Sequence, residues 1–184
     1  MSDTPVLLII AVQKGLAEPS LGQRNNPEAE ANMVKLLTAW RDRRWPTVHI
    51  RHNSVEANST LRPELPGNAY KDEILPLPGE IEFCKTTNSA FVGTGLEQHL
   101  RDNGLTKLVI VGLTTDHCVS ATTRSAADLG FDVTLVADAS AAFGRRGYDG
   151  KFYSGEQIHR VNVVSLDGEF CRVRQTAQVL EEPG

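Results

Sequence analysis

The chain has 184 residues, of which 40% are hydrophobic and 23% are charged, as is usual for a globular domain. Its formal net charge of -4 argues against a surface that binds nucleic acid. The apolar run at 6–12 is too short for a membrane span and lacks the basic residues that open a signal peptide. Three cysteines without close pairs argue against a disulfide framework and favour a reducing cytoplasm. We therefore expect one cytoplasmic domain over 1–184, with neither membrane nor nucleic acid as a partner.

Apolar runs and amphipathic patterns alternate along the chain. The aliphatic run at 6–12 predicts a central strand covered on both faces. Pro27, an acidic first turn and apolar residues at helical spacing predict a helix over 27–44. Ser154 is expected to cap a later helix. Further strands are expected at 46–51, 81–84, 106–111, 131–137 and 169–173, and further helices at 94–103, 119–129, 154–166 and 175–180.

This alternation predicts a three-layer α/β/α fold with a doubly wound, mainly parallel, six-stranded sheet. Ligands bind such sheets at the carboxyl ends of the strands. Residues expected at that edge are Ala11, His52, Lys85, the pair 113–114 and Asp138, which ends its predicted strand and is a candidate for orienting the site. Two irregular stretches, 52–79 and a mobile loop at 143–155, are expected to shape the pocket.

Cys118 lies where a predicted strand gives way to a predicted helix. Unpaired N–H groups in the first turn of a helix favour a thiolate and can also receive an oxyanion. The same position equally suits a buried thiol that only fills space. Lys85, at the end of another predicted strand, would favour the thiolate if it lies close to Cys118. The adjacent Cys84 would point to the other face, so we expect Cys84 in the core or just behind the site, and Cys171 in the core.

Several segments carry a family pattern in their order and spacing. They are 7–13, Lys85 with 89–91, 93–96, 112–119 (Gly-Leu-Thr-Thr-Asp-His-Cys-Val), 122–124, 137–139 and 158–160. Together they resemble the isochorismatase-like cysteine hydrolases, which include nicotinamidases, carbamoylsarcosine amidohydrolases, ureidoacrylate and biuret hydrolases, and isochorismatases. The resemblance covers nearly the whole chain.

The resemblance implies that Lys85 and Cys118 belong to a catalytic triad whose third member, an aspartate, falls on Ala11. In the implied mechanism the aspartate takes the thiol proton and returns it to the leaving amine. The thiolate attacks an amide carbonyl, and water then hydrolyses the thioester. Because alanine cannot hold a proton, we expect little or no turnover. An engineered substitution and a natural loss would both explain Ala11, and the otherwise intact pattern favours the engineered change.

The resemblance also implies a cis peptide bond between Leu113 and Thr114. The amides of Thr114 and Cys118 would then form the oxyanion hole. The candidate substrate-binding residues are Phe91, Gln13, His52 and Thr115. Phe91 suits the core equally well, and His52 suits a polar surface equally well.

We expect neither a metal ion nor another cofactor. Nicotinamidases carry an Asp-x-His set and a further histidine after the second strand, whereas this chain reads Ile-Arg-His-Asn-Ser at 50–54. His49 and His52 are three apart on a strand, so they face opposite sides and cannot share an ion. The absence of this Asp-x-His motif and its further histidine also argues against nicotinamide as the substrate.

The residues and the resemblance together predict a metal-independent cysteine amidohydrolase that acts on a small amide. The resemblance also implies a homodimer or homotetramer, as among the relatives. One alternative is vinyl ether hydrolysis of the isochorismatase type, which relies on the aspartate and needs no cysteine. Another is a catalytically silent protein that binds small molecules or a partner. Ala11 weakens both enzymatic predictions.

Overall fold

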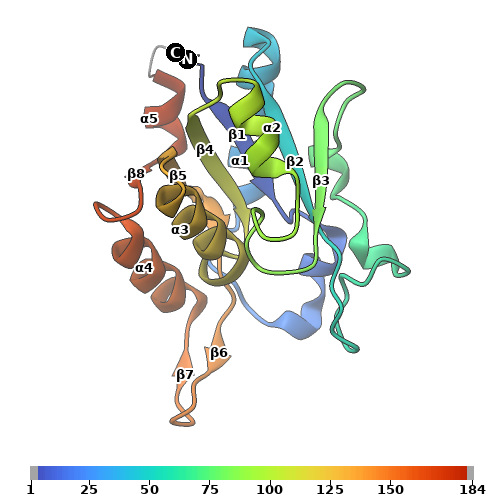
Figure 1. Ribbon diagram of the computed structural model, residues 1–184. Helices are drawn as coiled ribbons and strands as arrows, with labels where there is room; N and C mark the ends of the chain where they lie inside the picture. The colour runs from blue at the N-terminus through green and yellow to red at the C-terminus, as the bar shows by residue number, and fades with distance from the viewer. Residues whose placement is uncertain (1–3, 182–184) are drawn as a thin grey trace.

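A computed structural model describes residues 4–181 and contains a six-stranded parallel sheet in the order β3-β2-β1-β4-β5-β8 (Figure 1). The strands are β1 (Val6–Ile10), β2 (Thr47–His52), β3 (Ile81–Lys85), β4 (Lys107–Leu113), β5 (Asp132–Ala141) and β8 (Arg172–Arg174). The predicted α/β class and the parallel six-stranded sheet are confirmed. The last strand begins three residues later than expected.

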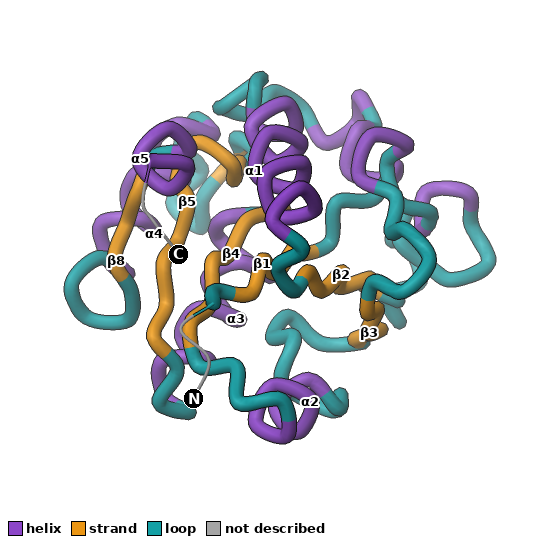
Figure 2. The backbone as a smooth tube through the Cα atoms, turned by 90° about the horizontal axis from the view of Figure 1, so that it is seen from above, coloured by secondary structure: helices purple, strands orange, loops and turns teal. Residues whose placement is uncertain are grey.

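Helices cover both faces of the sheet, which gives the three predicted layers (Figure 2). They are α1 (Ala29–Arg43), α2 (Leu96–Asp102), α3 (Ser120–Asp128), α4 (Gly155–Leu166) and α5 (Thr176–Glu181). Side chains of α1 and α5 form one buried cluster with the sheet, and those of α2, α3 and α4 form the other. No helix within residues 4–181 is long and apolar enough to cross a membrane.

Strand β1 is the centre of the sheet because its aliphatic residues suit a strand that is covered on both faces. All five of its residues have no exposed surface. It pairs in parallel with β2 on one side and with β4 on the other, so that Leu8 lies between Val48 and Ile110. The ends of β1, β2 and β4 are thereby fixed at one edge of the sheet.

Strand β5 is longer than the sequence predicts, and this corrects the role expected for Asp138. The strand continues to Ala141, so Asp138 lies inside it rather than at its end. Its Oδ1 accepts hydrogen bonds from the backbone N–H and the hydroxyl of Thr176, both at 2.8 Å. Asp138 therefore holds the start of α5 against the sheet, and the expectation that it orients the site is wrong.

The stretch 143–155, expected to be a loop, contains a two-stranded antiparallel hairpin that projects beyond the sheet (Figure 1). Its strands are β6 (Arg145–Arg146) and β7 (Phe152–Tyr153). The turn closes through backbone hydrogen bonds from Gly147 N to Lys151 O and from Gly150 N to Gly147 O. The glycines that suggested a loop thus form the turn of a hairpin.

Ser154 caps α4, as the sequence predicts. Its hydroxyl accepts a hydrogen bond from Gln157 N at 3.2 Å, and Gln157 Oε1 accepts one from Ser154 N at 2.8 Å. We expect Ser154→Ala to lower the free energy of unfolding by about 1 kcal/mol, measured by urea denaturation. Ser154→Asp keeps a capping oxygen and should lose much less. Equal losses in the two variants would contradict the capping role.

Candidate active site

Three chain segments bring their functional residues to the carboxyl edge of the sheet. Ala11 directly follows β1, Lys85 ends β3, and Cys118 lies in a π-helical turn, Thr115–Val119, that follows β4. The peptide bond between Leu113 and Thr114, just before this turn, is cis, as the resemblance implies. The structure therefore brings together the cysteine and the lysine that the sequence pattern singled out.

Lys85 is buried, with 1% of its surface exposed, and its ammonium group has three acceptors. Nζ lies 3.0 Å from Cys118 Sγ, 3.0 Å from His52 Nδ1 and 2.8 Å from the carbonyl oxygen of Thr87. Burial lowers the pKa of Lys85 from its ordinary value, and the contact with Cys118 acts in the opposite direction. All three N–H groups of the ammonium ion are used in these contacts.

Cys118 is also buried, with 8% of its surface exposed. Its Sγ is 3.9 Å from Asn88 Oδ1, and Asn88 itself is exposed. A hollow of about 160 Å³ is lined by His52, Ser54, Val55, Glu56, Thr86, Thr87 and Asn88. Most of these side chains are polar. The hollow therefore suits a small polar molecule, and it shares Asn88 with the surroundings of the thiol.

His52 contacts the cysteine–lysine pair through the lysine. Burial and then the positive charge of Lys85 lower the pKa of His52 to about 4. The imidazole is consequently neutral at pH 7. Because Nδ1 faces the lysine ammonium, Nδ1 acts as the acceptor and the ring proton resides on Nε2.

Gln13 and Thr115, two candidate substrate-binding residues, form hydrogen bonds within the protein. The Gln13 side chain has no exposed surface; its Nε2 donates to the carbonyl oxygens of His52 and Asn68, and its Oε1 accepts from His52 N. Thr115 is equally buried, and its hydroxyl lies 2.8 Å from His159 Nδ1. Gln13 thus holds the backbone at the end of β2, and Thr115 holds the imidazole of His159.

Phe91 lies against the core. Its ring stacks on that of Phe131, with centroids 5.6 Å apart and planes inclined by 28°. It packs against the buried cluster that contains Cys118. Phe91 is partly buried and packs against the core, and its role in substrate binding stays a prediction.

Ala11 has an unusual backbone conformation, with φ of 50° in the left-handed region. Its N–H donates to Ile50 O at 2.8 Å, and its side chain is fully buried in the same cluster as Cys118. Among residues other than glycine, asparagine and aspartate adopt this region most readily, because their short polar side chains offset its cost. The backbone at position 11 thus suits aspartate better than alanine.

The other two cysteines differ from each other in exposure. Cys84 is exposed, so the prediction that it lies in the core or behind the site is wrong. The reason is that β3 is an edge strand, in which Lys85 alone is buried. Cys171 is buried, as predicted, and burial is the largest factor that raises its pKa to about 11.

Thr87 and Asn88 belong to the site but were not predicted from the sequence. Both contact the cysteine–lysine pair, and the polar run Thr-Thr-Asn directly after Lys85 was the available signal. The ion pair between Arg145 of β6 and Asp116 was also not predicted. These last two residues border a second hollow, of about 240 Å³, which also reaches Thr114.

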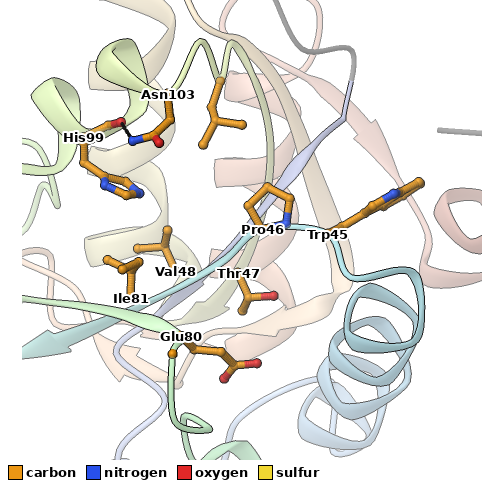
Figure 3. A pocket seen from close by; sticks show the side chains of 10 residues that line it. Trp45, Pro46, Thr47, Val48, Glu80, Ile81, His99 and Asn103 are labelled. Atoms are coloured by element: carbon orange, nitrogen blue, oxygen red, sulfur yellow. Dashed lines mark hydrogen bonds between the residues drawn. The ribbon is translucent and has the colours of Figure 1, made fainter.

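A larger cavity, of about 260 Å³, lies at the opposite end of the sheet, where β2 and β3 begin (Figure 3). His99 of α2, Asn103 directly after α2, and the strand residues Val48 and Ile81 line it. This cavity contains neither Lys85 nor Cys118. Within residues 4–181, no group of three or more histidine, cysteine, aspartate or glutamate side chains is arranged to hold a metal ion.

Fold and site together define an α/β protein with a buried cysteine–lysine pair at the carboxyl edge of a parallel sheet. The isochorismatase domain model matches residues 5–165, and the chain belongs to the isochorismatase family of hydrolases. It is 40% identical over 182 residues to the isochorismatase family protein YrdC of Bacillus subtilis, covering 99% of this chain and 97% of that protein.

Two further comparisons address the structure and the chemistry. The crystal structure of an isochorismatase-family protein from Chromobacterium violaceum has a TM-score of 0.94 and 48% identity, covering 97% of this chain and 93% of that one. The ureidoacrylate amidohydrolase RutB of Agrobacterium fabrum is 36% identical over 92 residues, which are 45% of this chain and 40% of that enzyme. Amidohydrolases are thus among the relatives of this chain.

Proposed function

We propose that this chain is a cysteine-dependent hydrolase built to cleave the C–N bond of a small amide or ureido compound. The observation that carries the proposal is the 3.0 Å contact between Lys85 Nζ and Cys118 Sγ in a buried setting. A neighbouring ammonium ion favours the thiolate, which is the nucleophilic form of cysteine. The amidohydrolase among the relatives supports a C–N bond as the target.

In the proposed reaction, the Cys118 thiolate attacks the carbonyl carbon of the substrate. The amides of Thr114 and Cys118 receive the oxyanion, the amine leaves, and water hydrolyses the thioester. The amine must take up a proton as it leaves. The residue that would carry this proton belongs at position 11 in this proposal. Ala11 has no group that can carry a proton.

The pocket supports a small and polar substrate. The hollow lined in part by Asn88, a neighbour of Cys118, has a volume of about 160 Å³. His52, Thr87 and Asn88 reach it and also contact the cysteine–lysine pair. A compound with one carbonyl group and a few further polar atoms fits this size and lining.

A second candidate function is binding without catalysis, and Ala11 is the observation that favours it. A site with a folded pocket but no proton carrier would still bind a small molecule. The two functions differ in the state of Cys118. A catalytic site requires a reactive thiolate, whereas a site that only binds does not.

We expect Cys118 to react with iodoacetamide faster than Cys171 at pH 7, followed for each cysteine by peptide mapping. In Lys85→Met, which keeps a long side chain but removes the charge, alkylation of Cys118 should slow about tenfold or more. Cys84 serves as the internal control, because it is exposed and its rate should not change. Slow alkylation of Cys118 in both proteins would reject the nucleophile and favour the binding function.

A further inference from the structure

We propose that this chain, as it stands, selects acyl compounds by their leaving group. It cleaves aryl esters and thioesters, whose leaving group departs as an anion, and does not cleave amides that carry the same acyl group. The proposal rests on the proposed function of Cys118 and goes beyond it by naming the substrate class that the present residues can process.

Lys85 carries a buried charge whose contacts include no carboxylate. They are with Cys118, His52 and Thr87, and no carboxylate within residues 4–181 forms an ion pair with it. A buried ammonium ion requires a counter-charge, because an unpaired buried charge is strongly destabilising. Of the three contacts, Cys118 alone can become an anion. We therefore infer that Cys118 attacks as the thiolate, with Lys85 as its counter-charge and its proton released to solvent.

No residue at the site stores that proton for the leaving group. Ala11 has no titratable atom. His52 is neutral, and its Nδ1 already accepts from Lys85. The three N–H groups of Lys85 are directed at Cys118, His52 and the carbonyl oxygen of Thr87, so donating to a leaving group would break one of these contacts. The site supplies a nucleophile without supplying an acid.

A site of this kind can be acylated only by compounds whose leaving group needs no proton. The thiolate attacks the carbonyl carbon of an ester, the new C–S bond forms, and the C–O bond breaks as the alkoxide or phenolate takes the electron pair. No proton moves in this step. An amide would have to expel a nitrogen anion, which is far more basic than a phenolate or a thiolate. Acylation of Cys118 therefore depends on the stability of the leaving anion.

The acyl-enzyme then reacts with water. Water adds its oxygen to the thioester carbonyl, the C–S bond breaks, and the carboxylate leaves while both protons of the water go to solvent. Cys118 returns as the thiolate, and its ion pair with Lys85 is restored. The contact with Lys85 stabilises the departing thiolate, which makes Cys118 a good leaving group in this second half of the reaction.

The test uses one acetyl group on a series of leaving groups: 4-nitrophenyl acetate, phenyl acetate, ethyl acetate and 4-nitroacetanilide. Acetylation of Cys118 is followed by mass spectrometry of its peptide, and release of nitrophenolate or nitroaniline by absorbance. We expect the acetylation rate to fall steeply as the leaving group becomes more basic, with no acetylation from the anilide. Cys84→Ser, which removes the exposed thiol, should leave these rates unchanged.

Two results separate the failure of this inference from the failure of the proposed function. If 4-nitrophenyl acetate does not acetylate Cys118, or if Cys118→Ser gives the same release of nitrophenolate, Cys118 is not the nucleophile and both fail. If Cys118 is acetylated but the anilide reacts within about tenfold of phenyl acetate, the site contains an effective acid, and this inference alone fails.

Discussion

Replacing Ala11 with aspartate is expected to raise the rate of amide hydrolysis by about 10²–10⁴-fold, the usual contribution of a positioned acid or base. The new carboxylate would lie directly after β1, in the buried cluster that contains Cys118. The φ of 50° at this position favours aspartate over alanine, so the backbone does not have to change. The carboxylate would take the thiol proton and return it to the leaving amine.

The measurement is kcat/KM with 4-nitroacetanilide and with ureidoacrylate, the compound for which the amidohydrolase relative is named. Ala11→Asn is the matched control, because asparagine has nearly the same shape and also adopts left-handed backbone angles, but it cannot carry a proton. We expect a gain in Ala11→Asp and none in Ala11→Asn. Equal gains would assign the effect to shape, and no gain in either variant would favour the function of binding without catalysis.

The restored carboxylate is also expected to change the selectivity among leaving groups. The carboxylate should accelerate hydrolysis of the anilide much more than hydrolysis of 4-nitrophenyl acetate, because nitrophenolate departs without a proton. The ratio of the ester rate to the anilide rate should therefore fall in Ala11→Asp. A rise in both rates by the same factor would mean that the carboxylate acts on the nucleophile and not on the leaving group.

The sequence predicts the cysteine–lysine pair because of a general property of parallel sheets. All strands of such a sheet end at one edge, so residues that follow different strands meet there. Lys85 and Cys118 come from β3 and from the turn after β4, and the structure places them 3.0 Å apart. Strand assignment predicted that both residues lie at this edge, and the resemblance to the cysteine hydrolases identified them as a catalytic pair.

The partners of Gln13 and Thr115 are not predictable in the same way. Each side chain bonds to a group far away in the sequence: Gln13 to the backbone of His52 and Asn68, and Thr115 to His159. A polar residue beside a site has the same sequence signature whether it contacts a ligand or the protein. Tertiary packing alone distinguishes the two.

The extension of β5 was missed for a physical reason as well. The residues at 137–142 are alanine, aspartate and serine, which have low strand propensity. Side chains from the region before and within α1 hold this segment. Asn26 Nδ2 donates to the carbonyl oxygens of Ala137 and Ser140, and Asn32 Nδ2 donates to that of Asp138. Long-range hydrogen bonds override local propensity here.

Replacing Gly112 with alanine is expected to have the largest effect on stability. Gly112 lies in β4 opposite Ile10 of β1, and its φ is 137°. A Cβ atom here would overlap the carbonyl oxygen of Ile10 and lie 2.7 Å from its nitrogen. The unfavourable backbone angle costs about 1–2 kcal/mol and the forced separation of packed atoms about 1–3 kcal/mol. We expect the free energy of unfolding to fall by about 2–5 kcal/mol, measured by urea denaturation.

Gly130→Ala is the matched control, because Gly130 also has a positive φ, of 83°, but a Cβ atom there would meet no atom within 4 Å. It should lose about 1–2 kcal/mol, the backbone part alone. In Gly112→Ala the overlap is with Ile10, and these two residues directly precede Leu113 and Ala11. Forcing β1 and β4 apart at this point would therefore also move Ala11 away from Leu113, on the two sides of the site. Cys118 in folded Gly112→Ala should therefore lose its fast alkylation, whereas Gly130→Ala should keep it. Equal losses of stability in the two variants would mean that β1 shifts away from the new Cβ atom at no energetic cost. The close approach of β1 and β4 would then not hold the site together.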